Sequence, residues 1–225
     1  MKFEIISRTG SQEIVFDPRQ LVIAGWAGRD KAAMEHHIVE LEALGIARPK
    51  TTPTFYRVAA ERLTQADMIE ELGDKSSGEV EPLLLRHNGA LYVGLGSDHT
   101  DREVEAYGIS VSKQLCAKPV STTLWPMDEV KDHWDSLVLR SWIETETGRV
   151  LYQEGSVASL LMPLETMARY EAEGHFEDGT AMLCGTMPAI GGIQYSTCFS
   201  AELEDPVLGR TITLGYKIAS LPILG

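Results

Sequence analysis

Two glutamates at the start of an apolar segment, Glu79 and Glu81, have a spacing that could support chemistry. Side chains of a β-strand alternate between its two faces, so residues two positions apart point to the same side. Two neighbouring carboxylates repel each other unless a cation lies between them. Their hard oxygen atoms suit Mg²⁺, Mn²⁺ or Ca²⁺. The pair could therefore bind a metal ion, but a solvated strand face has the same spacing and is the commoner origin of an isolated E-x-E.

A second concentration of polar groups extends from Gly96 to Glu103, with the sequence Gly-Ser-Asp-His-Thr-Asp-Arg-Glu. An apolar strand that runs into a turn crowded with charged groups is typical of a functional loop. Asp98 could bind a metal, or it could cap a helix that starts near Thr100, with Asp101 in its first turn. The two roles are compatible, because one carboxylate oxygen can cap the helix while the other binds a cation.

A histidine-containing segment, Glu35-His36-His37-Ile38-Val39-Glu40, could supply a general base. On a helix His37 and Glu40 are neighbours at i and i+3, so they can form a hydrogen-bonded dyad. The carboxylate would orient the imidazole and raise its basicity. His36 could pair with Glu40 in the same way, and a surface ion pair is the alternative interpretation.

Two further candidates lie later in the chain. Lys118 precedes a Thr-rich stretch, but its local sequence does not distinguish it from Lys113 or from an ordinary solvated lysine. The turn over residues 183–188 exposes backbone N–H groups and the hydroxyl of Thr186, which can bind a carboxylate. A tight turn without a ligand would have the same pattern.

Many short strands with few helices are expected to position these residues, which predicts a β-rich α+β fold. The predicted elements are a strand hairpin within residues 1–24, a helix within residues 25–45, strands at 79–85 and 90–95 joined by a turn at Asn88-Gly89, a helix from about Asp128, strands at 137–139 and 150–152, a helix from Pro163 to Gly174, and strands over the last fifty residues. No repeat or linker is visible. We therefore expect a single domain over residues 1–225.

Composition narrows the possible partners. The 225 residues include 20 Lys and Arg against 33 Asp and Glu, which gives a net charge of −13. This acidic balance argues against nucleic acid or an anionic membrane as the main partner. No apolar stretch approaches the length of a membrane span, and the 3 cysteines show no C-x-x-C spacing. We therefore expect a cytoplasmic protein with reduced thiols.

The order of the motifs resembles the fumarylacetoacetate hydrolase superfamily over nearly the whole chain, as a divergent branch. The matching segments are Val22-Ile23-Ala24-Gly25 with the helix behind it, Pro53-Thr54-Phe55-Tyr56-Arg57, Glu79-Val80-Glu81, the segment from Asp98 to Glu103, Lys118 before Thr122-Thr123, and the segment from Glu177 to Pro188. The fourth is similar to the family pattern D-x-S/T-x-R-D/E, which assigns the ligand role to Asp98 rather than to Asp101. The last is similar to L-x-P-G-D-x-I-x-T-G-T-P.

The resemblance implies a mixed β-sandwich roll with a few short helices, arranged as a homodimer. It implies a divalent metal, Mg²⁺ or else Mn²⁺ or Ca²⁺, held by Glu79, Glu81 and Asp98. It implies a small anionic substrate bound by Thr186, Gly185 and Arg102. Lys118, and not Lys113, is expected to reach the cavity as a catalytic residue. The helix at 30–44 is expected to act as a mobile lid that brings the catalytic residues His37 and Glu40 over the metal.

The reaction expected from the resemblance is hydrolytic cleavage of a C–C bond in a 2-oxo acid or 1,3-dicarbonyl compound, through a metal-stabilised enolate. Decarboxylation, or hydration and dehydration, at the same site is the alternative. An alternative of another class is a non-catalytic domain that binds a metal or an anion. Two departures favour it: Lys31 stands where family members have a histidine, and Glu105 stands where many have a glutamine.

Overall fold

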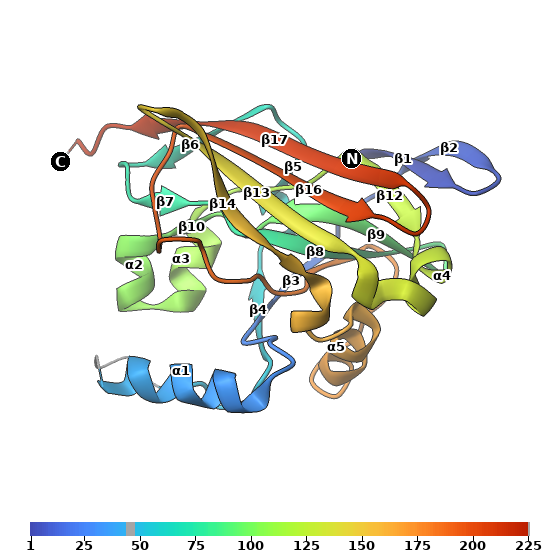
Figure 1. The fold of residues 1–225 in the computed structure, drawn as a ribbon, viewed down its shortest axis with the longest axis horizontal. Helices are drawn as coiled ribbons and strands as arrows, with labels where there is room; N and C mark the ends of the chain where they lie inside the picture. The colour runs from blue at the N-terminus through green and yellow to red at the C-terminus, as the bar shows by residue number, and fades with distance from the viewer. Residues whose placement is uncertain (44–47, 225) are drawn as a thin grey trace.

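The computed structural model describes residues 1–43 and 48–224, and two β-sheets form its body (Figure 1). The larger sheet has eight strands among these residues. In spatial order they are β2 (Gly10–Val15), β1 (Lys2–Ser7), β12 (Thr123–Pro126), β9 (Ala90–Ser97), β8 (Val80–His87), β15 (Thr180–Leu183), β3 (Gln20–Gly25) and β4 (Thr54–Val58). The smaller sheet has the order β14 (Gly148–Ser156), β13 (Val138–Thr145), β16 (Cys198–Asp205), β17 (Arg210–Leu221) and β6 (Met68–Leu72).

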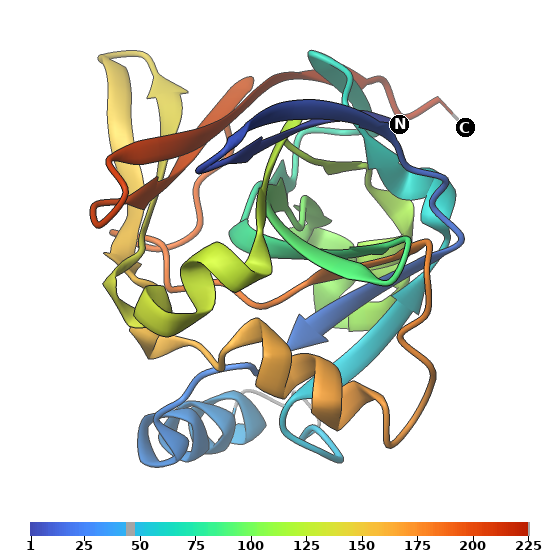
Figure 2. The ribbon, with the colours of Figure 1, turned by 90° about the vertical axis from the view of Figure 1, so that its right-hand side faces the viewer.

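Short ribbons and helices complete the fold. Two small ribbons pair β10 (Thr100–Asp101) with β7 (Ser76–Ser77), and β11 (Lys118–Pro119) with β5 (Leu63–Thr64). The helices are α1 (Lys31–Ala43), α2 (Arg102–Tyr107), α3 (Ile109–Leu115), α4 (Met127–Val130) and α5 (Pro163–Tyr170), with 3₁₀ turns at Ala60–Arg62, Lys131–Ser136 and Val157–Ser159. Figures 1 and 2 place α1 and α5 on the side of the molecule opposite the five-stranded sheet. No helix in the described part of the chain is long and apolar enough to cross a membrane.

Strand β8 lies at the centre of the core and is covered on both faces. Leu84 packs into a large cluster that includes Leu139 of the five-stranded sheet. Leu83 and Leu85 point the other way, into a second cluster with Phe3 of the N-terminal hairpin. A strand buried on both faces reads as a continuous apolar run, as residues 82–85 of β8 do.

The β8–β9 hairpin has the turn predicted from the sequence. Asn88 and Gly89 form its two-residue loop, both with positive φ, at 50° and 77°. Positive φ at both central positions is the geometry that an Asn-Gly turn favours. This turn fixes the register, so that Val80 pairs with Ser97 and Glu81 with Gly96.

The structure confirms the strand-rich α+β class and several predicted elements. The hairpin of β1 and β2 is antiparallel, as expected. Strand β3 does not extend this hairpin but runs parallel to β15. Helix α1 lies within the predicted range 25–45, whereas helix α3 was not predicted.

Candidate metal centre and its cavity

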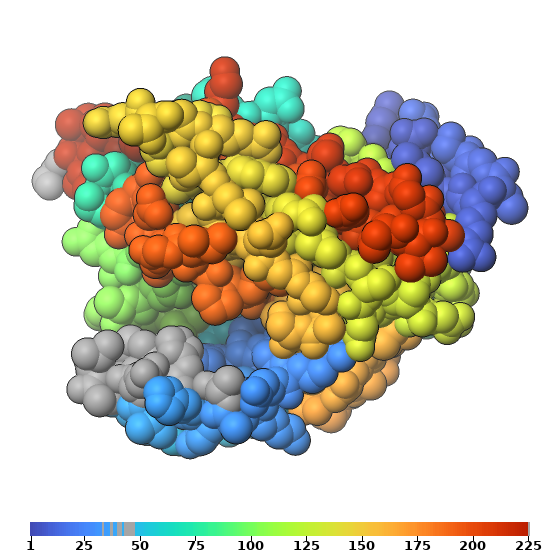
Figure 3. Space-filling view, viewed as in Figure 1, coloured from blue at the N-terminus to red at the C-terminus, as the bar shows by residue number. Residues whose placement is uncertain are grey.

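A cavity of about 620 Å³ opens between β3, α1, the α2–α3 pair and the loop that follows β15. In Figure 3, α1 (blue) and the orange segment after β15 face each other across a recess of the surface. Its outer wall is largely apolar and includes Met34, Tyr56, Ile109 and Ile193. The charged groups lie at its floor, where β8 begins.

Three carboxylates converge here: Glu79 and Glu81 line the floor, and the fully buried Asp98 lies next to them. Oxygen atoms of Glu79, Glu81 and Asp98 all lie within 4.8 Å of one another. The hairpin register explains the convergence, because the Asp98 N–H donates to the Glu79 carbonyl (3.0 Å) and continues the β8–β9 ladder. Glu79 and Asp98 are therefore cross-strand neighbours, and Glu81 lies on the same face two residues along β8. The residues that the sequence proposed as ligands are thus brought together.

Two lysines compensate the charge of Asp98. The Lys113 ammonium donates to Asp98 Oδ2, and the Lys118 ammonium lies 3.3 Å from Oδ1. Burial alone would raise the pKa of Asp98, but the two positive charges outweigh burial and hold the pKa below its usual value. Asp98 is therefore a carboxylate that stays ionised although its side chain is fully buried.

Glu81 has the opposite electrostatic environment. Its side chain is buried, and it accepts a hydrogen bond from the Gly185 N–H at 2.7 Å. Burial, reinforced by the charge of Asp98, raises the pKa of Glu81 well above its usual value. A buried carboxylate that disfavours its own charge is a group that a bound cation would stabilise. The donor set of three carboxylates thus fits a hard divalent cation.

The expectation that Lys118, and not Lys113, reaches the cavity is wrong. Lys113 lines the cavity, whereas Lys118 is fully buried behind Asp98. The Lys118 ammonium also donates to the carbonyls of His99 and Cys116, which hold it in place. The local sequence could not separate the two lysines because α3, which directs Lys113 toward the carboxylates, has no clear helical pattern.

The residues expected to bind substrate line the cavity, but protein groups already engage them. Arg102 forms ion pairs with Glu79 (3.0 Å) and Glu105 (2.8 Å). The Gly185 N–H is donated to Glu81, and the Thr186 hydroxyl is donated to the Val80 carbonyl (2.8 Å). In this arrangement the three residues hold the floor of the cavity, and their role in substrate binding stays a prediction.

Buried polar groups that the sequence did not single out support the floor. Gln153 of β14 accepts from the Val80 N–H (3.0 Å) and donates to Thr186 Oγ1 (2.8 Å). Behind Asp98, the His99 ring lies between the Tyr216 hydroxyl (3.0 Å) and Ser76 Oγ (2.9 Å). Burial and the nearby charge of Lys118 lower the pKa of His99 to about 3, so this ring is neutral at physiological pH. Only tertiary contacts between distant segments reveal these groups.

The alternative of Asp98 as a helix cap is also wrong. Asp101 is the residue that caps α2, because its Oδ1 accepts from the N–H groups of Glu103 (3.0 Å) and Val104 (2.9 Å). Asp101 therefore has a structural role that needs no metal.

The proposed dyad lies on α1, whose N-terminal end borders the cavity through Asp30 and Met34. The side chains of His37 and Glu40 lie outside the described part of the structure. The expectation that they act together over the metal stays a prediction.

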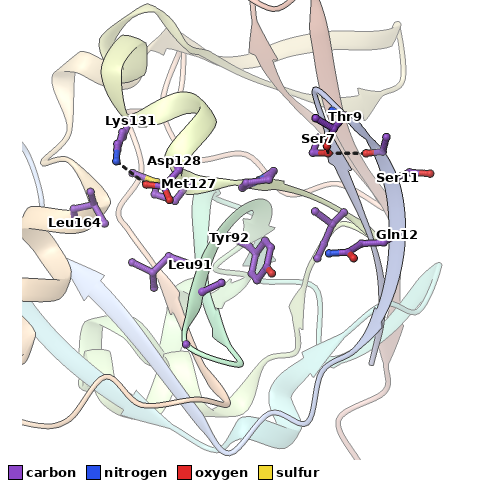
Figure 4. A pocket seen from close by; sticks show the side chains of 15 residues that line it. Ser7, Thr9, Ser11, Gln12, Leu91, Tyr92, Met127, Asp128, Lys131 and Leu164 are labelled. Atoms are coloured by element: carbon purple, nitrogen blue, oxygen red, sulfur yellow. Dashed lines mark hydrogen bonds and ion pairs between the residues drawn. The ribbon is translucent and has the colours of Figure 1, made fainter.

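A second cavity of about 530 Å³ lies between the β1–β2 hairpin, the β8–β9 turn and α4 (Figure 4). Its charged residues Asp128 and Lys131 form an ion pair with each other (2.6 Å), and Ser7 and Thr9 share a hydrogen bond (3.1 Å). The carboxylate cluster lies in the other cavity, which is therefore the better candidate for a functional site.

Comparison with known proteins gives the same fold. A yeast fumarylacetoacetate hydrolase family protein has a TM-score of 0.64 and 16% identity, over 92% of this chain and 95% of its own. A putative fumarylacetoacetate hydrolase family protein from Yersinia pestis has a TM-score of 0.63 and 16% identity, over 96% and 100%. A 2-keto-3-deoxy-D-arabinonate dehydratase, solved with magnesium and 2,5-dioxopentanoate, has a TM-score of 0.62 and 17% identity, over 92% and 75%.

These likenesses confirm the predicted resemblance at the level of the fold. In sequence, no curated protein matches the chain. A family model described as "Protein of unknown function (DUF2848)" matches residues 24–216, a span that includes the three carboxylates, both lysines and Thr186. The chain therefore belongs to the DUF2848 family and has the fold of the fumarylacetoacetate hydrolase family proteins.

Proposed function

We propose that this protein is a divalent-metal-dependent enzyme that acts on a small 2-oxo acid or 1,3-dicarbonyl compound. The observation that carries the proposal is the convergence of three carboxylates: Glu79 and Glu81 line a cavity large enough for such a molecule, and the buried Asp98 lies next to them. A divalent cation held by these carboxylates would supply Lewis-acid polarisation of a substrate carbonyl. Mg²⁺ is the first candidate, because a structure with this fold was solved with magnesium and a dioxo compound.

The charges around the floor favour an anionic substrate only once the cation is bound. With every group ionised, the four carboxylates exceed the cations by one charge; the carboxylates are Glu79, Glu81, Asp98 and Glu105, and the cations are Arg102, Lys113 and Lys118. A bound divalent cation changes the net charge of this group from one negative to one positive charge. A substrate carboxylate would then be attracted to a site that repels it otherwise.

Hydrolysis of an acylpyruvate-like C–C bond is the first reaction we propose. Water adds its oxygen to the acyl carbon, the neighbouring C–C bond breaks, and its electron pair is held as an enolate until a proton arrives. His37, oriented by Glu40, would take the proton from water. The resulting imidazolium would return this proton to the carbon of the enolate, which completes the cleavage and restores the neutral base.

Dehydration of a 2-oxo sugar acid is the second candidate. It is favoured by the fold and the ligands of the arabinonate dehydratase structure. Such a reaction would use the same carboxylates, with loss of a hydroxyl group replacing the attack of water.

The test measures the ultraviolet absorbance of acylpyruvates, oxaloacetate and 2-keto-3-deoxy sugar acids after addition of the protein with Mg²⁺ or Mn²⁺. The hydrolase is supported if the acylpyruvate absorbance falls only when the cation is present, and if it does not fall with the Glu81→Gln variant. Asp101→Ala is the matched control, because this carboxylate caps α2 and should leave cation affinity unchanged. Metal binding without turnover of any substrate would instead support a non-catalytic binding domain.

The role of the dyad needs its own measurement. His37→Gln should lower the rate of the chemical step by about 10²–10⁴-fold and remove the limb of the pH profile near the histidine pKa. An unchanged profile would exclude His37. His99 would be a poor substitute, because it is buried and its nitrogens are engaged by Tyr216 and Ser76.

A further inference from the structure

The ammonium of Lys113 forms an ion pair with Asp98, one of the three carboxylates. It donates to Asp98, and the charges of Glu79 and Glu81 also act on it. The residue is only 6% exposed although it lines the cavity. Lys113 therefore performs, at Asp98, part of the electrostatic task that a bound metal ion would perform.

Lys113 and Lys118 differ in how firmly they are held. The Lys118 ammonium is fixed by two carbonyl oxygens in addition to Asp98. Within the described residues, the Lys113 ammonium donates its hydrogen bond to Asp98 and lies 5.8 Å from the centre of the Tyr56 ring. Lys113 extends from α3 at the wall of the cavity, so its flexible side chain can leave Asp98 without leaving the site.

The charge balance favours such a movement when a divalent cation arrives. A cation bound between the carboxylates would repel an ammonium that contacts the same oxygen of Asp98. The Tyr56 ring, which the ammonium already faces at 5.8 Å, can keep a favourable contact with it after it leaves Asp98, because an aromatic face attracts a cation. There Lys113 would face the part of the cavity in which a substrate must lie.

We propose that Lys113 competes with the divalent cation for Asp98, and that the bound cation displaces its ammonium into the cavity, where it binds the anionic group of the substrate. The inference rests on the proposed function, because it requires the carboxylates to bind a metal. It gives the substrate-binding role expected of Arg102 to a lysine whose charge is freed by the metal itself. Arg102 stays paired with Glu79 and Glu105.

The first experiment measures the Mn²⁺ dissociation constant by calorimetry and by electron paramagnetic resonance, in the absence of substrate. Lys113→Met and Lys113→Gln should bind Mn²⁺ at least tenfold more tightly than the wild type. Lys131→Met, which removes an exposed lysine paired with Asp128 in the second cavity, should bind it as the wild type does. If both Lys113 variants bound Mn²⁺ with a dissociation constant equal to or larger than that of the wild type, the inference would be overturned. The proposed function would still stand.

If neither the wild type nor the variants bind Mn²⁺, the proposed function itself fails, and the inference fails with it. Two Lys113 variants are used because Met removes the polar end group whereas Gln keeps one, so a folding defect caused by either side chain alone would be recognised. Circular dichroism checks the fold of each variant.

The second experiment uses the unmodified chain. Reductive methylation followed by peptide mass spectrometry should show that Lys113 is protected without metal and becomes methylated when Mn²⁺ is present. Lys118 should stay protected in both conditions, because its ammonium is enclosed by protein carbonyls. Protection of Lys113 that persists at saturating Mn²⁺ would mean that the ammonium does not leave Asp98, and this result would also overturn the inference.

Discussion

Two buried carboxylates a few ångströms apart show how neighbours decide the charge of a residue. Asp98 and Glu81 are both hidden from solvent, and burial disfavours the ionised form of each. Two lysine ammonium groups stabilise the charge of Asp98. Glu81 accepts one backbone N–H and is repelled by the charge of Asp98. The pKa of the first is therefore lowered and that of the second is raised.

Replacing Glu81 by Gln should stabilise the metal-free protein at neutral pH. The raised pKa means that the folded state binds this proton more tightly than the unfolded state does, so stability falls as pH rises from about 4.5 toward the folded pKa. Gln keeps the shape and can still accept from Gly185, but it carries no charge. Each factor of ten in proton affinity corresponds to about 1.4 kcal/mol. Urea unfolding at pH 5 and pH 8, with a chelator, should show a gain for Glu81→Gln that is larger at pH 8.

Replacing Asp98 by Asn should lower the stability of the protein, the opposite of the effect expected for Glu81→Gln. Removing this charge leaves two buried ammonium groups facing each other without a carboxylate between them. Breaking a buried ion pair by removing one partner costs about 3–5 kcal/mol. In the wild type, the lowered pKa of Asp98 gives stability that is present above pH 4 and is lost as pH falls through the folded pKa. Urea unfolding of Asp98→Asn at pH 7 should show a loss on this scale, and a stability within 1 kcal/mol of wild type would contradict the pairing.

At the scale of elements, the part of the site that follows from strand pairing was predictable from the sequence. The Asn88-Gly89 turn sets which residues of β8 and β9 lie opposite each other, and alternation along the strands then brings the three carboxylates to one face. The family pattern independently preferred Asp98 over Asp101, and the structure assigns Asp101 to the helix cap. Local rules of pairing and capping were sufficient here.

The part of the site that depends on contacts between distant segments was not predictable. Helix α3 is short, and its Ser and β-branched residues have weak helix propensity, so packing rather than sequence determines it. Its existence decides that Lys113 reaches the carboxylates. Gln153 and Tyr216 likewise reach the site from the five-stranded sheet, across more than fifty residues of chain.

Gly185 follows β15, and its backbone conformation affects both the local fold and the orientation of Glu81 in the site. Its φ is +96°, and a Cβ there would lie 2.7 Å from Ala27 Cβ. Gly185→Ala should therefore cost stability through both backbone strain, about 1–2 kcal/mol, and this clash. It should also weaken cation binding, because the N–H that orients Glu81 would move. Thermal unfolding and Mn²⁺ titration measure the two effects.

The double variant Gly185→Ala with Ala27→Gly separates the causes. Removing the Ala27 Cβ relieves the clash but leaves the backbone strain, so it should recover only part of the lost stability. A double variant as unstable as the single one would show that the contact with Ala27 does not matter.

For the molecule as a whole, the two sheets meet at the candidate site as well as in the apolar core. Gln153 comes from the five-stranded sheet, but its partners Val80 and Thr186 belong to the eight-stranded sheet and the loop after it. It also bonds Ser141 within its own sheet (2.9 Å) and the carbonyl of Met187 (2.6 Å). The position of Glu79 and Glu81, on either side of Val80, is thus tied to the packing of one sheet on the other.

Gln153→Met should uncouple the sheets at this point. Methionine has a similar length but cannot hydrogen-bond the buried Val80 N–H or the Met187 carbonyl, and each polar group left unpaired costs about 1–3 kcal/mol. We expect a loss of free energy of unfolding in the upper part of that range or above it, measured with urea, together with weaker Mn²⁺ binding. Gln65→Met is the matched control, because Gln65 is only half-buried and bonds the backbone of Lys2 and Ser121, away from the contact between the sheets. It should lose less stability and bind Mn²⁺ as the wild type does. If Gln153→Met lost stability but kept its full affinity for Mn²⁺, the carboxylates would be positioned by the β8–β9 hairpin alone, and the five-stranded sheet would have no part in the site.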